Sequence, residues 1–284
     1  MTETILAIDI GGTKTLAALV RGAKVLREVK VPTSREAGPD DWIAGVAQAV
    51  GGWDEPFAAI GVAVTGFVND GLWSGLNPAT LGVPQDYPLV ATIEATFGRP
   101  AVAANDAQVA AWGEYRFGAG EGEDLVFLTI STGVGGGIVV NGRPLLGLSG
   151  HFGQTLLASS GEEPFENRVS GRWMAAEAKR ADKDVEAPGV FAAARTGESW
   201  ARAIIDASAR RVALLCQDIQ FMFDTPRIAI GGGIGLAEGY LDNVRSQLPA
   251  YRPRLAPNLV PARLGSHAGI VGVADLATST LLER

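Results

Sequence analysis

The sequence predicts an α/β protein built from two lobes. Short apolar runs typical of strands alternate with longer stretches in which apolar residues recur at helical spacing. Glycines cluster just after several of the strand-like runs. A polar, glycine-rich turn between two apolar runs occurs once in each half of the chain. The alternation indicates the α/β class, and the repeated turn indicates two lobes with a ligand cleft between them.

The first predicted element is a strand over residues 5–10 that ends in a turn suited to phosphate. Asp9, near the end of this strand, could hold a hydrated magnesium ion, and a second apolar run covers residues 16–20. Glycines in the turn lack Cβ atoms, so their N–H groups can approach an anion closely. An ordinary hairpin is the alternative, because paired glycines are common in turns. The turn residues assigned to phosphate are Gly11, Gly12, Thr13 and Lys14.

Further strands and helices are expected along the rest of the chain. Strand-like runs cover residues 58–64, 101–104, 124–130 and 227–230. Helices are expected from near Asp40, then over residues 106–117, 200–223, 236–248 and 269–282. The helix over 200–223 has one apolar face with a spacing of three to four residues. That face consists of Ile205, Val212, Leu215, Ile219 and Phe223.

Two polar residues stand where the strand over 101–104 ends. Asn105 and Asp106 follow this strand directly and open the next helix. An acid at the carboxyl end of a strand, above a cleft, is well placed to act as a general base. Both residue types also favour helix N-cap positions. The two roles are compatible, because Asn105 can cap the helix while Asp106 points into the cleft.

A second glycine-rich turn follows the strand over 124–130. Residues 130–137 include four glycines, and each glycine inside a strand costs about 0.5–1 kcal/mol relative to alanine. Close approach of a phosphate to the backbone accounts for them, and a tight bulged hairpin is the alternative. A third cluster, residues 231–233, precedes a helix expected at about Leu236, as in sites where a helix N-terminus faces a nucleotide. The residues assigned to the nucleotide are Thr132, Gly133, Gly135, Gly232 and Gly233.

Polar side chains among glycines mark a region suited to the recognition of hydroxyl groups. His151 and Gln154 lie within residues 150–154, and Glu166 stands shortly before Ser170. Each is alternatively a solvated loop residue, and His151 is alternatively a structural imidazole. The two isolated histidines do not make a metal site. The chain also has no Gly-x-Ser-x-Gly nucleophile motif and no Cys–His pairing.

The composition is that of a globular protein with a large core. Of the 284 residues, 47% are hydrophobic and 19% are charged. The formal net charge of −7 argues against a nucleic-acid partner. No apolar run approaches the ~20 residues of a transmembrane helix, and the N-terminus lacks the basic start of a signal peptide. The single cysteine, Cys216, excludes an intrachain disulfide and is expected to be a core thiol in a cytoplasmic protein.

Six short motifs spread along the chain occur together in one known family. They lie at residues 7–14, 63–66, 76–78, 105–107, 131–137 and 230–235. Together they resemble the sugar kinases of the ROK family (repressor, open reading frame, kinase). The resemblance implies the actin-like ATPase (ribonuclease H-like) fold and transfer of phosphate from ATP, with Mg²⁺, to the 6-hydroxyl of a hexose. It implies Asp106 as the catalytic base and sugar contacts from Gly66, Asn77, Asn105, His151 and Glu166.

Within the ROK family the chain is similar to bacterial N-acetylmannosamine kinases. Segments within residues 76–90, 105–112, 148–156 and 235–241 carry this similarity. The resemblance therefore implies N-acetylmannosamine as the substrate, in the catabolism of sialic acids and amino sugars. Glucokinases, mannokinases and fructokinases of the same family are the alternatives. A non-catalytic sugar-binding protein is a further alternative, disfavoured because Asp106 and both glycine turns are present.

The zinc motif of the family is missing from this chain. Gln154 stands where the family has a zinc-binding histidine, and the family's cysteine loop is reduced to residues 159–164 with no cysteine. We therefore expect no structural zinc. The loop must be held by packing instead, for which Phe165 and Trp173 are candidates. His151 stands where the family commonly has a sugar-binding glutamate, as in some N-acetylmannosamine kinases.

The expected organisation has two lobes. Residues 1–105 form the N-terminal lobe with the first phosphate turn and sugar contacts, and residues 106–284 form the C-terminal lobe with the second turn and the adenosine site. The last helix is expected to pack back on the N-terminal lobe. The resemblance implies a homodimer that binds a hexose or N-acetylhexosamine. The net charge and the lack of a long apolar run predict no nucleic-acid or membrane partner. A ROK repressor would carry a helix-turn-helix module ahead of the first turn, which here begins at residue 5 of an acidic chain.

Overall fold

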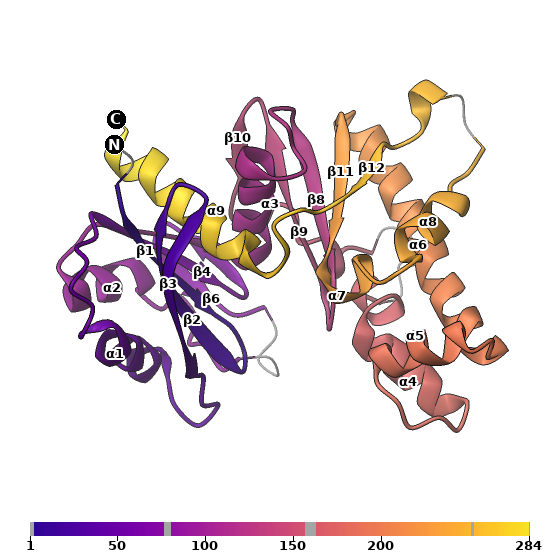
Figure 1. The fold of residues 1–284 in the computed structure, drawn as a ribbon, viewed down its shortest axis with the longest axis horizontal. Helices are drawn as coiled ribbons and strands as arrows, with labels where there is room; N and C mark the ends of the chain where they lie inside the picture. The colour runs from indigo at the N-terminus through magenta and orange to yellow at the C-terminus, as the bar shows by residue number, and fades with distance from the viewer. Residues whose placement is uncertain (1–2, 77–80, 157–162, 251–252, 284) are drawn as a thin grey trace. The chain divides into compact units, whose positions relative to one another are not determined.

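The computed structural model describes residues 3–76, 81–156, 163–250 and 253–283. The chain divides into two compact units (Figure 1). The first comprises residues 1–117, 144–149 and 266–284, and the second comprises residues 118–143 and 150–265. Both contain an open β-sheet with helices packed on it, so the predicted α/β class is confirmed.

The first unit is organised around a five-stranded mixed sheet. The strand order is β3-β2-β1-β4-β7. Strands β3, β2 and β1 are antiparallel neighbours, whereas β1, β4 and β7 run parallel. Strands β1 and β4 are almost entirely buried, as expected for apolar runs covered on both faces. The bounds are β1 Ile5–Ile10, β2 Lys14–Arg21, β3 Lys24–Pro32, β4 Ala59–Val64 and β7 Ala101–Asn105, and a small hairpin pairs β5 Phe67–Asn69 with β6 Leu72–Ser74.

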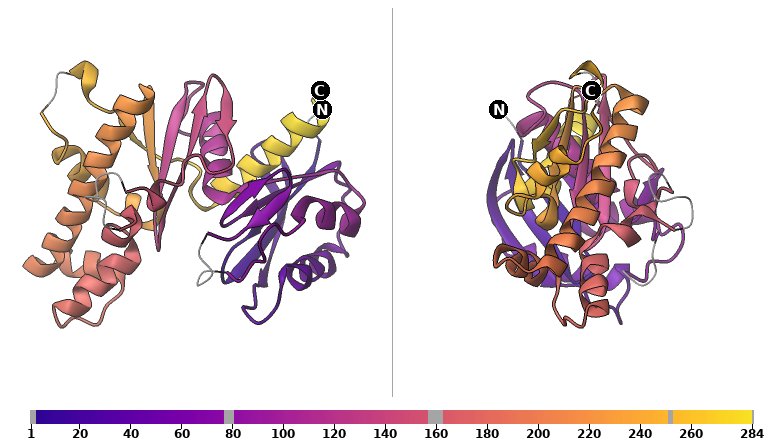
Figure 2. Two further views of the ribbon diagram at one scale, coloured as in Figure 1. Left: turned by 180° about the vertical axis from the view of Figure 1, so that it is seen from behind. Right: turned by 90° about the vertical axis from the view of Figure 1, so that its right-hand side faces the viewer.

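Helices cover this sheet. Helices α1 (Pro39–Val50) and α2 (Leu89–Phe97) pack on one another and on strands of the sheet. Helix α9 (Ala268–Ala277), yellow in Figures 1 and 2, packs on β1 and β4 and continues into a π-helical turn over Thr278–Leu282. Helix α3 (Asp106–Phe117) packs on α9. The C-terminal helix thus belongs to the first unit.

The contact between α3 and α9 depends on glycines. A Cβ atom at Gly272 would lie 1.8 Å from the carbonyl oxygen of Val109, and one at Gly113 would lie 2.7 Å from that of Ala268. Only glycine permits these two helices to approach so closely. Because α3 is held in this way, the boundary between the units falls after residue 117, rather than after residue 105 where it was expected.

The second unit contains a sheet of similar design. The strand order is β10-β9-β8-β11-β12, with β8 antiparallel to β9 and β11 parallel to β8 and β12. In each unit a glycine-rich turn therefore connects a central strand to its antiparallel neighbour, β1 to β2 and β8 to β9. This is the internal duplication that the sequence suggests. The bounds are β8 Leu125–Ile130, β9 Val134–Val140, β10 Arg143–Leu145, β11 Arg227–Gly231 and β12 Leu259–Pro261.

Helix α6 (Ser199–Phe223) contributes many of the buried apolar residues of the second unit. Four of the five residues predicted for its inner face are buried, and Phe223 is partly buried against the same core. Cys216 is fully buried, and burial raises the pKa of its thiol to about 12, so it is a core thiol. The other helices are α4 Gly171–Arg180, α5 Ala187–Arg195, α7 Gly232–Gly235 and α8 Tyr240–Ser246, with 3₁₀ turns at Phe152–Gln154, Phe165–Arg168, Pro253–Leu255 and Gly265–His267.

The helix expected over residues 236–248 differs from prediction. Helix α7 begins directly at Gly232, and α8 is shorter than expected. Gly239 between them adopts a φ of +77°, which interrupts a continuous right-handed helix.

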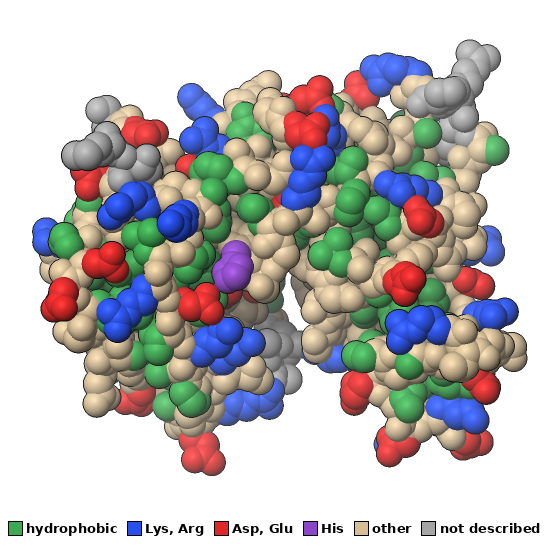
Figure 3. Space-filling view, in the orientation of Figure 1, with side chains coloured by type: hydrophobic (Ala, Val, Ile, Leu, Met, Phe, Trp, Pro, Cys, Tyr) green, Lys and Arg blue, Asp and Glu red, His purple; other side chains and the backbone are tan. Residues whose placement is uncertain are grey.

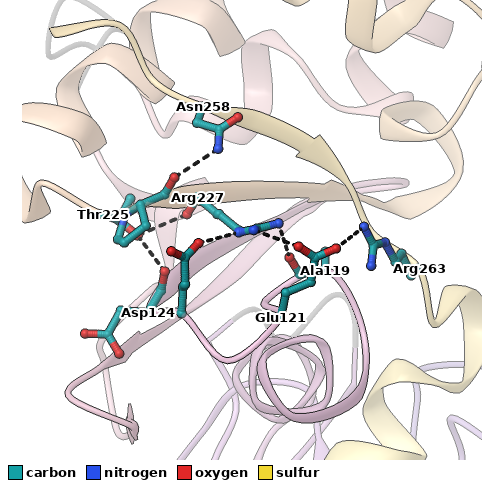
Figure 4. A network of polar contacts seen from close by, with 9 residues as sticks. Ala119, Glu121, Asp124, Thr225, Arg227, Asn258 and Arg263 are labelled. Carbon is teal, nitrogen blue, oxygen red and sulfur yellow. Dashed lines mark hydrogen bonds and ion pairs between the residues drawn. The ribbon is translucent and has the colours of Figure 1, made fainter. Parts of the chain in front are cut away.

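A polar network fastens β11 beside β8 (Figure 4). The guanidinium of Arg227 donates to Glu123 at 2.8 Å and to the carbonyl oxygen of Ala119 at 3.3 Å, and it pairs with Glu121 at 2.7 Å. Asn258 donates to the carbonyl oxygen of Pro226, which links the segment before β12 to the start of β11. The network holds three strands at one end of the sheet, so the turns after β8 and β11 are positioned at the other end.

The surface carries charges of both signs. Acidic and basic side chains are interspersed over the face drawn in Figure 3, without a large patch of one sign. Among the described residues, every helix is too short or too polar to span a bilayer.

Candidate active site

The first glycine turn is a closed hairpin whose tip is accessible. The N–H group of Gly11 donates to the carbonyl oxygen of Lys14 at 3.2 Å, and Ile10 pairs with Thr15 across the turn. Gly12 is half-buried, whereas Thr13 and Lys14 are exposed. The carbonyl oxygen of Thr13 accepts from the backbone N–H group of Thr33, the residue directly after β3. The backbone is therefore fixed while two polar side chains stay available to a ligand.

Asp9 and Asp106 form an electrostatically coupled pair in the first unit. Asp9 is the penultimate residue of β1, and Asp106 is the first residue of α3. Burial, and to a smaller extent the negative charge of Asp106, raises the pKa of Asp9 to about 7, although the positive charge of Lys14 opposes both effects. Two carboxylates in a desolvated place are a typical site for a hard divalent cation or for proton transfer.

Asn105 organises the residues around this pair. Its side-chain oxygen accepts from the N–H groups of Ala107 at 2.9 Å and Gln108 at 3.2 Å, so the predicted N-cap is confirmed. Its side-chain nitrogen donates to the carbonyl oxygen of Gly66 at 2.8 Å. Gly66 has a φ of +93°, and a Cβ atom there would lie 2.3 Å from the carbonyl oxygen of Ser74. Asn105 thus joins the start of α3 to a turn that requires glycine.

Asp106 and Gln108 both belong to the first turn of α3, where Asp106 is half-buried and Gln108 is buried. Asp106 Oδ1 accepts from the N–H group of Ala107 at 2.7 Å, which orients the carboxylate at the helix N-terminus. Gln108 is buried and donates to the carbonyl oxygens of Gly147 at 2.9 Å and Ser149 at 2.6 Å. No feature of the sequence indicated these hydrogen bonds of Gln108. Asn77, the remaining site residue expected in this unit, lies outside the described residues.

The second glycine turn, between β8 and β9, is also tightly held. The N–H group of Ser131 donates to the carbonyl oxygen of Gly133 at 2.9 Å, and that of Gly171 donates to Ser131 at 2.7 Å. Thr132 is exposed at the tip, and Gly133 and Gly135 are half-buried. The start of α4 is therefore anchored against this turn.

Glu166 lies directly beside the second glycine turn. Its Oε2 accepts from the N–H group of Val134 at 3.3 Å and pairs with Arg172 at 3.2 Å, and its Oε1 accepts from Gln154 at 2.9 Å. A Cβ atom at Gly133 would lie 2.7 Å from the same Oε2. The residue before it, Phe165, is fully buried in the core. The carboxylate is thus fixed from three directions.

A cavity of about 420 Å³ opens beside this turn in the second unit. It brings together Thr132 and Gly233, two of the residues assigned to the nucleotide. A Cβ atom at Gly233 would meet no neighbouring atom, whereas Gly232 has a φ of +83° and lies against the carbonyl oxygen of Ile130. Gly233 therefore leaves space for a ligand, and Gly232 satisfies a backbone requirement. Other residues of the wall are Arg172, Phe191, Arg195 and Glu238.

His151 is placed at the entry to a short 3₁₀ turn. Its side chain is half-buried, and its carbonyl oxygen accepts from the N–H group of Gln154 at 3.0 Å. Among the described residues, no group of three or more His, Cys, Asp or Glu side chains is arranged to hold a metal ion.

Several residues of this region were missed by the sequence analysis. Arg172, Phe191 and Arg195 lie on α4 and α5, helices that were not predicted. The signal available for α4 was Ser170, which caps the helix by accepting from the N–H group of Trp173. No linear pattern indicated that these helices would line the same cavity as the glycine turns.

The chain matches the model of the ROK family over residues 5–280. It is 46% identical over 282 residues to a bifunctional enzyme NanE/NanK of Brucella melitensis, covering 98% of this chain and 54% of that protein. The chain thus spans about half the length of that curated relative. It is 38% identical over 294 residues to the N-acetylmannosamine kinase of Salmonella typhimurium, covering 98% of this chain and all of that enzyme.

Solved structures show the same fold. A ROK family glucokinase from Streptomyces griseus, in complex with glucose and AMPPNP, superposes with a TM-score of 0.80 at 29% identity. The match covers 97% of this chain and 99% of that chain. The resemblance to the actin-like sugar-kinase fold is therefore confirmed.

Proposed function

Because this chain belongs to the ROK family, we propose that it is a sugar kinase that transfers the γ-phosphoryl group of ATP to the 6-hydroxyl of a hexose. The observation that carries the proposal is the pair Asp9 and Asp106 beside the first glycine turn, in which burial and like charge raise the pKa of Asp9 to about 7. A kinase needs one carboxylate near the metal-bound phosphates and one near the attacking hydroxyl. Asp9 and Asp106 could supply these two carboxylates.

Asp106 is the proposed general base. Its carboxylate would accept the proton of the sugar 6-hydroxyl while that oxygen bonds to the γ-phosphorus and the bond to ADP breaks. The orientation of Asp106 by the N–H group of Ala107 supports this role. Asn105, Gly66, Asn77, His151 and Glu166 are the proposed contacts of the sugar.

The phosphates and the nucleoside are assigned to the two glycine turns and the cavity. Gly11, Gly12, Thr13 and Lys14 of the first turn, and Thr132, Gly133 and Gly135 of the second turn, are the proposed contacts of the phosphates. Gly232 and Gly233 would lie along the adenosine, which the open space at Gly233 supports. Asp9 would hold Mg²⁺, because carboxylate oxygens suit this ion. When bound, the ion supplies charge neutralisation of the phosphates.

N-acetylmannosamine is the proposed substrate. The support is the similarity to the NanE/NanK enzyme and to the N-acetylmannosamine kinase, the latter over its whole length. The test is a coupled assay of ADP release with N-acetylmannosamine, N-acetylglucosamine, glucose, mannose and fructose. Preference for an unsubstituted hexose would indicate another ROK hexokinase. ADP release with none of them, together with sugar binding, would indicate a non-catalytic sugar-binding protein.

We further propose that the enzyme contains no structural zinc, with Gln154 fixing Glu166 in place of a metal-held loop. Part of the loop over residues 159–164 lies outside the described residues. Metal analysis of the purified protein tests this proposal. One zinc per chain would overturn it.

A homodimer in the cytoplasm is the proposed state of the protein. Helix α6 exposes Leu214, Phe221 and Met222, apolar side chains of the kind that partner chains cover. Cys216 is a free thiol, as is usual in a reducing compartment. Light scattering at micromolar concentration would give the dimer mass. The mass of a monomer at these concentrations would contradict the proposed homodimer.

A further inference from the structure

We propose that Arg172 is a positioning residue that neutralises Glu166, so that the second glycine turn can accept the phosphates of a nucleotide. This inference rests on the proposed kinase function, which assigns phosphate contacts to Thr132 and Gly133 and a sugar contact to Glu166. No role was assigned to Arg172 from the sequence.

The geometry places a negative charge at the phosphate-binding turn itself. Glu166 Oε2 lies 3.3 Å from the backbone nitrogen of Val134 and 2.7 Å from the position that a Cβ atom of Gly133 would occupy. The glycines of this turn are suited to binding an anion, but the carboxylate of Glu166 already lies against the turn. Without compensation, this carboxylate would repel an incoming triphosphate.

Arg172 provides the compensating charge. Its Nη2 lies 3.2 Å from Glu166 Oε2, and its backbone N–H group donates to the carbonyl oxygen of Thr132 at 3.4 Å. Arg172 also lines the cavity that contains Thr132 and Gly233. A guanidinium has five N–H donors, so one group can hold a carboxylate and face a phosphate at the same time. Arg172 therefore stands between the residue assigned to the sugar and the cavity assigned to the nucleotide.

Gln154 cannot replace Arg172 in this role. Gln154 donates to the other carboxylate oxygen, Oε1, at 2.9 Å. It orients Glu166 but carries no charge. The two partners of Glu166 therefore have different roles. Gln154 orients the carboxylate, and Arg172 neutralises its charge.

A double-mutant cycle of charge-removing substitutions, read out as nucleotide affinity, tests the inference. Affinity for AMPPNP with Mg²⁺ is measured by calorimetry without sugar, so that turnover plays no part. R172Q should weaken binding by roughly tenfold, a loss between those expected for unit charges about 4 Å apart in bulk water and near a protein surface. E166Q alone should bind AMPPNP at least as tightly as the unsubstituted protein. E166Q combined with R172Q should recover most of the loss.

Arg195 supplies the matched control. It lines the same cavity from the end of α5 but is not one of the residues that pair with Glu166. R195Q removes an equal charge, yet its effect and that of E166Q should simply add. Recovery by E166Q should occur only in the R172Q background.

The outcomes separate this inference from the proposed function. If the unsubstituted protein does not bind AMPPNP, the kinase proposal itself fails. If it binds and R172Q binds equally well, only the role of Arg172 is overturned. A loss in R172Q that E166Q does not relieve would show that Arg172 acts through the fold or through its own contact with the phosphate rather than by neutralising Glu166, and would also overturn the inference.

Discussion

Gln154 donates a 2.9 Å hydrogen bond from its Nε2 to Oε1 of Glu166. Gln154 occupies the position where the family resemblance implies a zinc ligand, and Glu166 is the proposed sugar contact. The two are therefore joined by a direct hydrogen bond. A neutral amide suits this place, because it can orient the carboxylate while Arg172 supplies the charge.

Loss of the Gln154 contact should weaken sugar binding. We expect Q154A to raise the KM for the sugar about fivefold, equivalent to about 1 kcal/mol for one hydrogen bond, with a smaller effect on kcat. Steady-state kinetics with varied sugar would measure both. Q48A, an exposed glutamine on α1, is the control and should match the unsubstituted enzyme. Unchanged KM in Q154A would show that the contact does not organise Glu166.

Replacement of Asp106 should stop turnover and leave sugar binding intact. D106N removes the proposed base but keeps the shape of the side chain, so kcat should fall by about 10²–10⁴-fold. A coupled ADP assay would give kcat, and calorimetry would give the sugar affinity. D182N, at an exposed position, should leave both unchanged. Near-normal kcat in D106N would remove Asp106 from the mechanism.

The raised pKa of Asp9 should make the stability of the ligand-free protein depend on pH. Its folded-state pKa is about 7, against 3.8 for an unperturbed aspartate. Between these values the folded chain holds a proton that the unfolded chain has released, so this group's contribution to the free energy of unfolding falls as pH rises. Above about pH 7 the contribution of Asp9 to the free energy of unfolding no longer changes with pH.

An asparagine at position 9 should remove this dependence. The advantage of D9N over the unsubstituted protein in urea denaturation should grow from pH 5 to pH 8 in buffer without divalent cations. Parallel stability curves for the two proteins would show that Asp9 titrates normally.

The contact between α3 and α9 should tolerate no side chain at Gly272. A Cβ atom there would lie 1.8 Å from the carbonyl oxygen of Val109, so G272A must push the helices apart. We expect a loss of about 3 kcal/mol, seen as a lower melting temperature. The control is G45A in α1, where a Cβ atom meets nothing and alanine should stabilise by about 0.5–1 kcal/mol. Equal melting temperatures for the two variants would contradict this view of the interface.

Local chemistry made part of the fold and site predictable. The strand over residues 5–10 and the helix over 106–117 were located correctly, because each is bounded by residues that stop or cap it. The helix expected over 236–248 was not, because Gly239 takes up a left-handed conformation that composition alone does not reveal. Helices α4 and α5 were missed, and with them the arginines of the cavity wall.

By itself, the sequence determined the α/β class, the two glycine turns, the cap at Asn105 and membership of the ROK family, because these depend on residue type and on neighbours along the chain. Only the tertiary structure decided the raised pKa of Asp9, the ion pair of Arg172 with Glu166 and the approach of α3 to α9. Each of these depends on burial or on charges brought together from distant segments. Such proximity is a property of the folded chain, and no local pattern carries it.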